Sequence, residues 1–314
     1  MPRDSFLSFF LMKTARAFLT MLLLVSLVFF TLRLAGNPAE ILLEPDASQE
    51  MIDEAAQKWG LDRPLMEQYL LYLRNAVTGD FGRSFHNGRD AMMIVLEHAP
   101  KTLLLGGAAL ALSLFIGLPL GTVAALRRGG PVDRIAMTLS VIGYAIPNFF
   151  LAVILMLIFA VQFSLLPTAG SETIWHLILP AVTLGTSGAG TIARFSRSAV
   201  LETLEQPYMR AARGRGVLGP RLIVRHAFPN AAIPVVTVIG FMVGGLIGGA
   251  IVTETVFAWP GIGKLFVYSV GSRDIPVVQV IIFLSAASMV ATNLLVDLAY
   301  GWLDPRIRLS RSRK

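Results

Sequence analysis

Three short stretches of the chain have residue types and spacings that could support chemistry. The first, GTSG at residues 185–188, places Ser187 between glycines, a pattern shared with the nucleophiles of intramembrane serine proteases. Such a serine needs a histidine base within hydrogen-bonding reach. The apolar runs that follow residue 230 contain no histidine, and His226 lies in a polar loop. The pattern is therefore better explained by small residues that let membrane helices pack closely.

The other two stretches resemble nucleotide-binding loops. GRGVLG at residues 214–219 fits G-x-G-x-x-G, but a dinucleotide site also needs a preceding strand and a later acidic residue. No acidic residue occurs between Glu205 and Glu254. WPGIGKL at residues 259–265 has Ala258 and Leu265 where a phosphate loop needs glycine and Ser/Thr. We therefore predict that this chain is not an enzyme and does not itself hydrolyse ATP.

The composition indicates a membrane protein. Of the 314 residues, 54% are hydrophobic and 15% are charged, whereas soluble domains carry about 25% charged residues. The absence of cysteine excludes disulfides, thiolate metal sites and a cysteine nucleophile, and four histidines do not suggest a metal site. The net charge of +7 could indicate nucleic acid, but the basic residues are distributed as in a membrane protein, so no nucleic-acid partner is expected.

Six apolar runs predict membrane-spanning helices, because a spanning helix needs roughly 20 mostly apolar residues. They cover residues 17–32, 102–126, 135–163, 176–195, 231–252 and 277–302. Pro147 predicts a kink in the third run, and the fourth is weaker because it is rich in small residues. The first run is long for a signal peptide and lacks a convincing cleavage site, so we expect an uncleaved anchor. The expected fold class is all-α and integral to the membrane.

The distribution of lysine and arginine predicts the orientation of these spans. With a cytoplasmic N-terminus, the cytoplasmic pieces carry 18 of the 27 basic residues and five of the 20 acidic ones. The stretch 36–101 has the opposite balance, with eleven acidic and six basic residues. We expect both termini in the cytoplasm and three parts of the chain: residues 1–35 with the first span, an external segment 36–100, and a five-helix core 101–314.

A polar insert at residues 208–230, YMRAARGRGVLGPRLIVRHAFPN, carries five arginines between two apolar runs. Each arginine costs roughly 2.5–3.5 kcal/mol at the centre of a bilayer, so the insert lies outside the membrane. Pro207 suits the first turn of a helix, and Gly214 and Gly216 can end that helix. We expect Pro220 to start a second short helix that Pro229 stops.

The first of these short helices has a recognisable face. Tyr208, Ala211 and Ala212 are spaced i, i+3, i+4 and are expected on the same side. Two alanines there would let another backbone or a groove approach closely, with Arg210 and Arg213 beside them.

This insert resembles the cytoplasmic loop signature of binding-protein-dependent ABC importer permeases, which combines E-A-A, a spaced glycine and I-x-L-P. The matching positions are Ala211, Ala212, Gly216, Phe228 and Pro229. The sequence departs from the pattern at Arg210, which replaces the glutamate, and at His226, which replaces the isoleucine. In that family the loop is a coupling helix that sits in a cleft of a separate ATPase subunit. The resemblance implies that residues 196–230 form the coupling loop and that Tyr208 contributes to it.

Three further stretches resemble the dipeptide, oligopeptide and nickel branch of that family, and its first-permease (B-type) subunits. They are WGLDRPLMEQYLLYLRNAVTGDFGRSF at 59–85, ETVFAWPGIGKLFVYSVGSRDIPVVQ at 254–279 and LDPRIR at 303–308. The resemblance implies the six-helix transmembrane domain of a type I ABC importer in a bacterial inner membrane. It also implies a second homologous permease, two ATPase subunits that bind ATP and Mg, and a periplasmic solute-binding protein. This chain itself would bind no cofactor.

Small and polar residues inside the predicted spans are the remaining candidates for function. Gly240, Gly244 and Gly248 form a small-xxx-small register that favours close helix packing. Polar residues inside a membrane are candidates for a pore by default, and they are Asn148, Glu254, Asn293 and Asp297. We expect Glu254 to cap the outer end of the fifth span and Asp297 to pair with an arginine near the inner surface.

Two other classes of protein remain as alternatives. An ATP-independent secondary transporter or channel would work without an ATPase, and usually has two related halves with more spans. A membrane-embedded enzyme would need a convergent catalytic set, which the sequence does not offer. The sequence leaves the substrate open among peptides, glutathione and nickel.

Overall fold

The computed structural model describes residues 3–34, 49–58, 60–217 and 219–303, and within these ranges the regular secondary structure is helical. This confirms the all-α class. The helices in chain order are α1 Arg3–Leu34, α3 Gln49–Lys58, α4 Leu65–Thr78, α5 Ala91–Leu126, α6 Pro131–Ala145, α7 Asn148–Leu155, the π-helix η1 Met156–Gln162, α8 Trp175–Glu205, α9 Pro207–Gly214, α10 Gly219–Leu222, the π-helix η2 Ile223–Ala227, α11 Phe228–Gly244, α12 Leu246–Gly249, α13 Ile251–Val256, α14 Ile262–Gly271 and α15 Ile275–Leu303. The LDPRIR motif after Leu303 and the basic C-terminal tail lie outside the described residues.

The predicted count of six spans is not matched directly. By length and composition, four stretches of the described chain can cross a membrane: Met12–Thr31, Ala91–Leu126, Gly219–Gly244 and Ile275–Asp297. The count rises to five when the bent pair of α6 with α7–η1 is counted as one span. The fourth predicted run lies in α8, which is not among them, because its many small and polar residues lower its hydropathy.

Helix α8 nevertheless lies at the centre of the bundle, where it packs against α5, α6, α7 and α11. Glycines make these contacts close: a Cβ at Gly121 of α5 would overlap the Ala193 backbone, and one at Gly190 would overlap the backbone of Ser140 in α6. A Cβ at Gly188 would overlap the Ser113 side chain. The GTSG stretch therefore serves helix packing, as the sequence predicted.

The third predicted span is broken rather than kinked. Helix α6 ends at Ala145, and its axis meets the following helix at 97°. Pro147 disfavours a helical conformation at the residue before it, and Ile146 is extended, with φ −72° and ψ 122°. Asn148 then starts α7.

The fifth predicted span differs from the prediction at both ends. Pro229 does not stop a short helix, because helical structure continues from Gly219 to Gly244. The π-helical turn η2 precedes Pro229, and its wider turn accommodates the missing N–H and the ring. Beyond Gly244 the chain bends and forms only the short helices α12 and α13.

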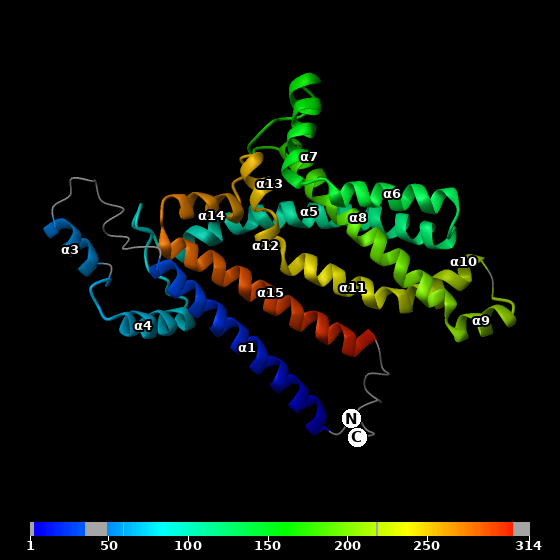
Figure 1. Ribbon diagram of the computed structural model, residues 1–314, viewed down its shortest axis with the longest axis horizontal. Helices are drawn as coiled ribbons and strands as arrows, with labels where there is room; N and C mark the ends of the chain where they lie inside the picture. Colours follow the sequence, from blue (N-terminus) through cyan, green and yellow to red (C-terminus); the bar gives the residue numbers. More distant parts are fainter. Residues whose placement is uncertain (1–2, 35–48, 59, 218, 304–314) are drawn as a thin grey trace.

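Helices α1 and α15 pack side by side (Figure 1), and α15 agrees with the predicted sixth span. Lys13 Nζ lies 2.7 Å from Asp297 Oδ2. The prediction that Asp297 pairs with an arginine was therefore wrong, because its partner on α1 is the lysine Lys13.

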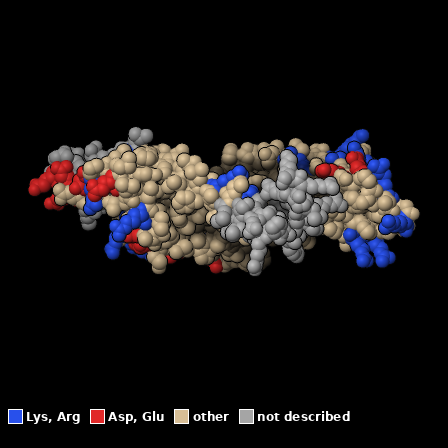
Figure 2. Space-filling view, turned by 90° about the horizontal axis from the view of Figure 1, so that it is seen from below, with Lys and Arg blue, Asp and Glu red and all other residues tan. Residues whose placement is uncertain are grey.

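Acidic residues gather at one end of the molecule, and basic residues gather at the other. Helices α3 and α4 lie at one end and α9 and α10 at the other (Figure 1). In Figure 2 the acidic residues cluster at the end of α3, whereas lysine and arginine cover the end of α9 and α10. This separation follows the distribution of charge along the sequence.

Candidate functional site

The 196–230 loop begins on the last turns of α8 and contains α9 and α10. Pro207 is in the first turn of α9, and Gly216 adopts φ +81°, a conformation that favours glycine. The sequence placed both boundaries of this helix correctly.

A small apolar core holds the 196–230 loop together. Met209 and Ala212 of α9 pack with Leu222 and Ala227, and all four side chains are buried. Leu204 and Val217 flank them. Ala212 therefore does not share an exposed face with Ala211, contrary to the sequence prediction, because the second helix folds back against α9 and covers it.

The outward side of the 196–230 loop is exposed and cationic. Tyr208 is 37% exposed and Phe228 is 43% exposed. Ala211 and Pro229 are also exposed, while His226 is half-buried. The exposed arginines are Arg210, Arg213, Arg215, Arg221 and Arg225, and they form much of the basic end seen in Figure 2. The local sequence pattern alone does not distinguish these exposed residues from the buried residues Met209 and Ala212.

Two ion pairs connect the start of this loop to the turn between α5 and α6 and to the first turn of α6. Arg197 Nε and Nη2 donate to the two oxygens of Asp133 over 2.6 and 2.7 Å, and Gly129 N–H donates to the same carboxylate. Asp133 is buried. Arg128 and Glu205 form a second, exposed pair. Sequence reasoning missed the role of Asp133, although it is the single acid in a basic loop.

At the opposite end of the core, Glu254 is fully buried and organises a second site. Thr102 Oγ1 donates to Glu254 Oε1 over 2.7 Å, and Lys264 N–H donates to Oε2 over 3.1 Å. Thr102 also accepts from Ile262 N–H, and Trp259 Nε1 donates to the Lys101 carbonyl. We call these residues, Lys101, Thr102, Glu254, Trp259, Ile262 and Lys264, the Glu254 hub.

The Glu254 hub explains the glycines of the WPGIG stretch. A Cβ at Gly261 would overlap the Glu254 carboxylate, and one at Gly263 would lie 2.6 Å from the Ile251 Cα. The two glycines thus let the loop close around the carboxylate. Glu254 is not a simple cap of the fifth span, because it joins α13 to α5 and α14, and sequence gave no signal that Thr102 is its partner.

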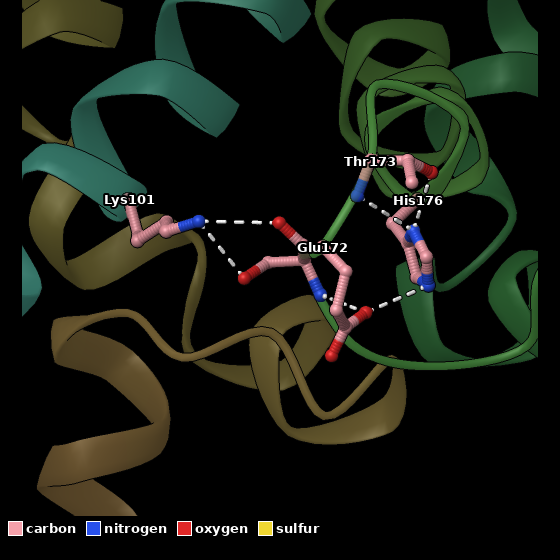
Figure 3. Close-up of polar contacts among 5 residues, drawn as sticks. Lys101, Glu172, Thr173 and His176 are labelled. Atoms are coloured by element: carbon pink, nitrogen blue, oxygen red, sulfur yellow. Dashed lines mark hydrogen bonds and ion pairs between the residues drawn. The ribbon is translucent and has the colours of Figure 1, made fainter.

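The turn before α8 is attached to the same hub (Figure 3). Lys101 Nζ donates to the Ser171 carbonyl and hydroxyl over 3.2 and 2.9 Å. His176 Nδ1 accepts from Thr173 N–H, so its Nε2 carries the proton and faces Glu172 Oε2 at 2.8 Å. The pKa of Glu172 is lowered, first by a hydrogen bond from its own backbone N–H. These contacts position the turn that leads into α8, and the residues that make them do not form a catalytic site.

The glycine register of the fifth span is split by the bend. A Cβ at Gly240 would overlap the Val296 side chain of α15, and one at Gly244 would lie 2.8 Å from Met289 Sδ. A Cβ at Gly248 would have no contact within 4 Å among the described residues outside its own helical segment. It does not pack as predicted, because α11 ends at Gly244 and the turn that follows removes Gly248 from that face.

The two remaining polar candidates lie apart from each other. Asn148 lines a cavity of about 270 Å³ between α5, α8 and α11, together with Ser113, Ser187 and Thr191. Asn293 is exposed on α15. The structure therefore does not bring the four intramembrane candidates into one site.

Comparison with known proteins gives the family. Residues 117–309 match the model of the binding-protein-dependent transport system inner membrane component, and residues 6–106 match the model of its N-terminal part. The chain is 39% identical over 303 residues to the glutathione transport system permease protein GsiC of Pectobacterium atrosepticum, which covers 96% of this chain and 99% of that protein. The GsiC protein of Escherichia coli strain K12 is 39% identical over 290 residues, covering 92% and 95%.

Solved structures share the fold. An inward-facing form of the MetNI methionine ABC transporter aligns with a TM-score of 0.57 at 22% identity, over 68% of this chain and 97% of that one. A crystal structure of an amino acid ABC transporter aligns with a TM-score of 0.52 at 16% identity, over 65% and 92%. These similarities show that the all-α fold is that of an ABC importer transmembrane domain. The chain belongs to the family of binding-protein-dependent transport system inner membrane components, as the multi-pass, non-hydrolysing permease subunit of an ABC importer that works with ATPase and solute-binding partners.

Proposed function

We propose that this permease forms one half of a translocation pore for glutathione or a related short peptide. A second homologous permease supplies the other half, two ATPase subunits bind ATP and Mg, and a periplasmic solute-binding protein delivers the solute. The names of the 39% identical relatives support the choice of solute. The segment 36–100 contacts the binding protein, and both termini lie in the cytoplasm, an orientation supported by the separation of charge in Figure 2.

The observation that carries this proposal is the 196–230 loop. It has its own apolar core, yet its outward side carries five exposed arginines around Tyr208 and Ala211. A loop built only to satisfy the positive-inside rule needs no core of its own. A folded, exposed element on the end of the central helix α8 is suited to receive a partner and transmit its movement.

Ala211→Arg tests the coupling role of this surface. The side chain of Ala211 is exposed, so the substitution leaves the loop core intact while it blocks close approach of an ATPase subunit. We expect normal membrane insertion, loss of ATPase co-purification and loss of ATP-driven glutathione uptake in proteoliposomes that contain the complete transporter. Ala169→Arg makes the same substitution at an exposed site of the turn before α8, outside the 196–230 loop, and should retain uptake.

Normal uptake and co-purification with Ala211→Arg would contradict the coupling role. Uptake by the purified chain without any ATPase would instead favour the secondary-transporter alternative. The same uptake assay with nickel in place of glutathione shows which of the two solutes the complete transporter carries.

A further inference from the structure

Asp133 connects α6 to α8 through its buried carboxylate. The residue lies in the first turn of α6 and is 4% exposed. Arg197 Nε and Nη2 of α8 donate to its two oxygens over 2.6 and 2.7 Å, and Gly129 N–H donates to Oδ2 over 2.9 Å. Bidentate pairing of a guanidinium with a carboxylate fixes the orientation of both groups as well as their distance. The start of α6 therefore cannot turn or slide on α8 without breaking these bonds.

Arg197 belongs to the last turns of α8, with which the 196–230 loop begins. Helix α8 is continuous up to Glu205, and the single residue Gln206 separates it from α9. Leu204 of α8 also packs against the apolar core of the loop. A displacement of α9 therefore reaches Arg197 through an unbroken helix and through apolar contact.

A second ion pair joins the same parts of the chain further along α8. Arg128 of the turn between α5 and α6 pairs with Glu205, and the two side chains are 63% and 66% exposed. Along a helix, positions 197 and 205 lie about 12 Å apart. Exposed pairs contribute little to stability, so the buried pair of Asp133 with Arg197 supplies most of the connection.

Beyond the ion pair, α6 and α8 remain in close contact. A Cβ at Gly190 of α8 would overlap the Ser140 carbonyl oxygen of α6, so the two backbones touch without an intervening side chain. The Arg194 guanidinium of α8 lies 4.6 Å from the centre of the Tyr144 ring of α6. Closely packed segments transmit a displacement rather than absorb it. The two helices therefore form one unit from the ion pair to the end of α6.

The far end of α6 adjoins the residues around the Glu254 hub. Helix α6 ends at Ala145, and α7 follows after the 97° break. Ala152 of α7 is buried in a cluster with Leu179 of α8 and Phe257. Phe257 lies at the C-terminal end of α13, the helix that carries Glu254. The unit of α6 and α8 thus extends from the 196–230 loop to the segment beside the hub.

We propose that Asp133 is a positioning residue for ATP-driven transport, and that it acts through Arg197. When an ATPase subunit displaces the 196–230 loop, the ion pair makes α6 follow α8, and the joined helices move α7 and the cluster around Phe257. Without the pair, α8 moves alone and ATP is hydrolysed with little transfer of solute. Packed rigid elements and ion pairs carry such coupling in proteins. That an ATPase displaces the loop rests on the proposed function, whereas the connection between α6 and α8 does not.

Asp133→Asn in the complete transporter tests the proposal, because it keeps the shape of the side chain and removes its charge. ATP hydrolysis and glutathione uptake are measured together in proteoliposomes. We expect hydrolysis within about twofold of the parent and a roughly tenfold fall in glutathione taken up per ATP, since the hydrogen bonds from Arg197 lose their charged acceptor. Glu172→Gln makes the same change from carboxylate to amide at a side chain that is 72% exposed, and should keep the parent ratio.

A double variant shows whether Asp133 acts through Arg197. Arg197→Gln should also lower the glutathione uptake per ATP. The double variant Asp133→Asn with Arg197→Gln should lower it no further than Arg197→Gln alone, because both changes remove the same ion pair. Losses that multiply in the double variant would contradict a role through this pair.

Spin labels measure directly whether α6 moves with α8. The chain contains no cysteine, so labels on this chain attach only at introduced cysteines. Leu139→Cys on α6 and Phe195→Cys on α8 replace side chains that are 56% and 47% exposed. In the assembled transporter we expect the same distance between the two labels with and without ATP. When Asp133→Asn is added, the distance should change on addition of ATP.

An unchanged ratio of uptake to hydrolysis in Asp133→Asn, or an equal proportional loss of both activities, would overturn the proposal. A distance between the labels that changes with ATP while Asp133 is intact would also overturn it, because α6 would then not follow α8. If Asp133→Asn does not assemble with its partners, this distance decides the question alone.

Failure of this proposal is distinguishable from failure of the proposed function. Loss of uptake in Ala211→Arg together with a normal ratio in Asp133→Asn would keep the loop as the ATPase contact and remove Asp133 from the transmission. Normal uptake in both variants would remove the coupling role of the loop itself.

Discussion

The Glu254 hub and the 196–230 loop use polar residues in opposite ways. In the hub, a fully buried carboxylate receives hydrogen bonds from a hydroxyl and a backbone N–H of two other segments. In the loop, an apolar core of four side chains carries arginines that remain on the surface. The polar groups of the hub bond to one another within the chain and stabilise the fold. The polar groups of the loop remain available to a partner.

The difference also shows how far each region depends on the rest of the chain. The partners in the hub lie 152 positions apart, at Thr102 and Glu254. The loop core lies between residues 209 and 227, with Ala227 at its end. Damage to the hub should therefore affect the whole bundle, and damage to the loop core should stay local.

The largest effect is expected from Glu254→Ala. It leaves the Thr102 hydroxyl and the Lys264 N–H without their acceptor and opens a cavity, so we expect a loss of about 3–4 kcal/mol of stability. Thermal unfolding of the purified chain in detergent should show a lower melting temperature. Glu172→Ala removes a carboxylate that is 72% exposed and should change little. Equal melting temperatures of Glu254→Ala and the parent would contradict the view that the hub stabilises the whole bundle.

Met209→Ala should have the next largest effect and act only on the loop. Truncating this buried side chain should cost about 2–3 kcal/mol, which weakens a core made of only four buried side chains. Limited trypsin digestion should cut faster at the loop arginines, with the melting temperature of the bundle unchanged. A global loss of stability without faster cleavage would show that the loop and the bundle unfold as one unit.

Asp133→Asn should have a smaller effect on the attachment of the loop to the bundle. It removes the charge that faces the bidentate Arg197, and we expect a loss of about 2 kcal/mol. Glu205→Gln breaks the exposed pair with Arg128 and should cost less than about 1 kcal/mol. Melting temperatures of the two variants provide the measurement, and a larger loss from Glu205→Gln would contradict the assignment.

Local sequence signals predicted the short helix of the loop well and its contacts poorly. Pro207 and Gly216 set the ends of α9 through restrictions on their own backbones, which act wherever the chain is placed. The same reasoning failed for Pro229, where a π-helical turn lets the helix continue. It also placed Ala212 outward, because i, i+3, i+4 spacing identifies a face but not what covers it.

The sequence by itself determined the all-α membrane class, the separation of basic and acidic segments, the close packing of the GTSG glycines and the family. These properties depend on composition, short spacings and motifs. Only the tertiary structure decided that Glu254 is buried against Thr102, that Asp133 holds Arg197, that the chain turns by 97° at Pro147 and that Gly248 leaves the packed face. The physical reason is that hydrogen-bond partners and helix faces depend on which distant segments pack together, and no local pattern carries that information.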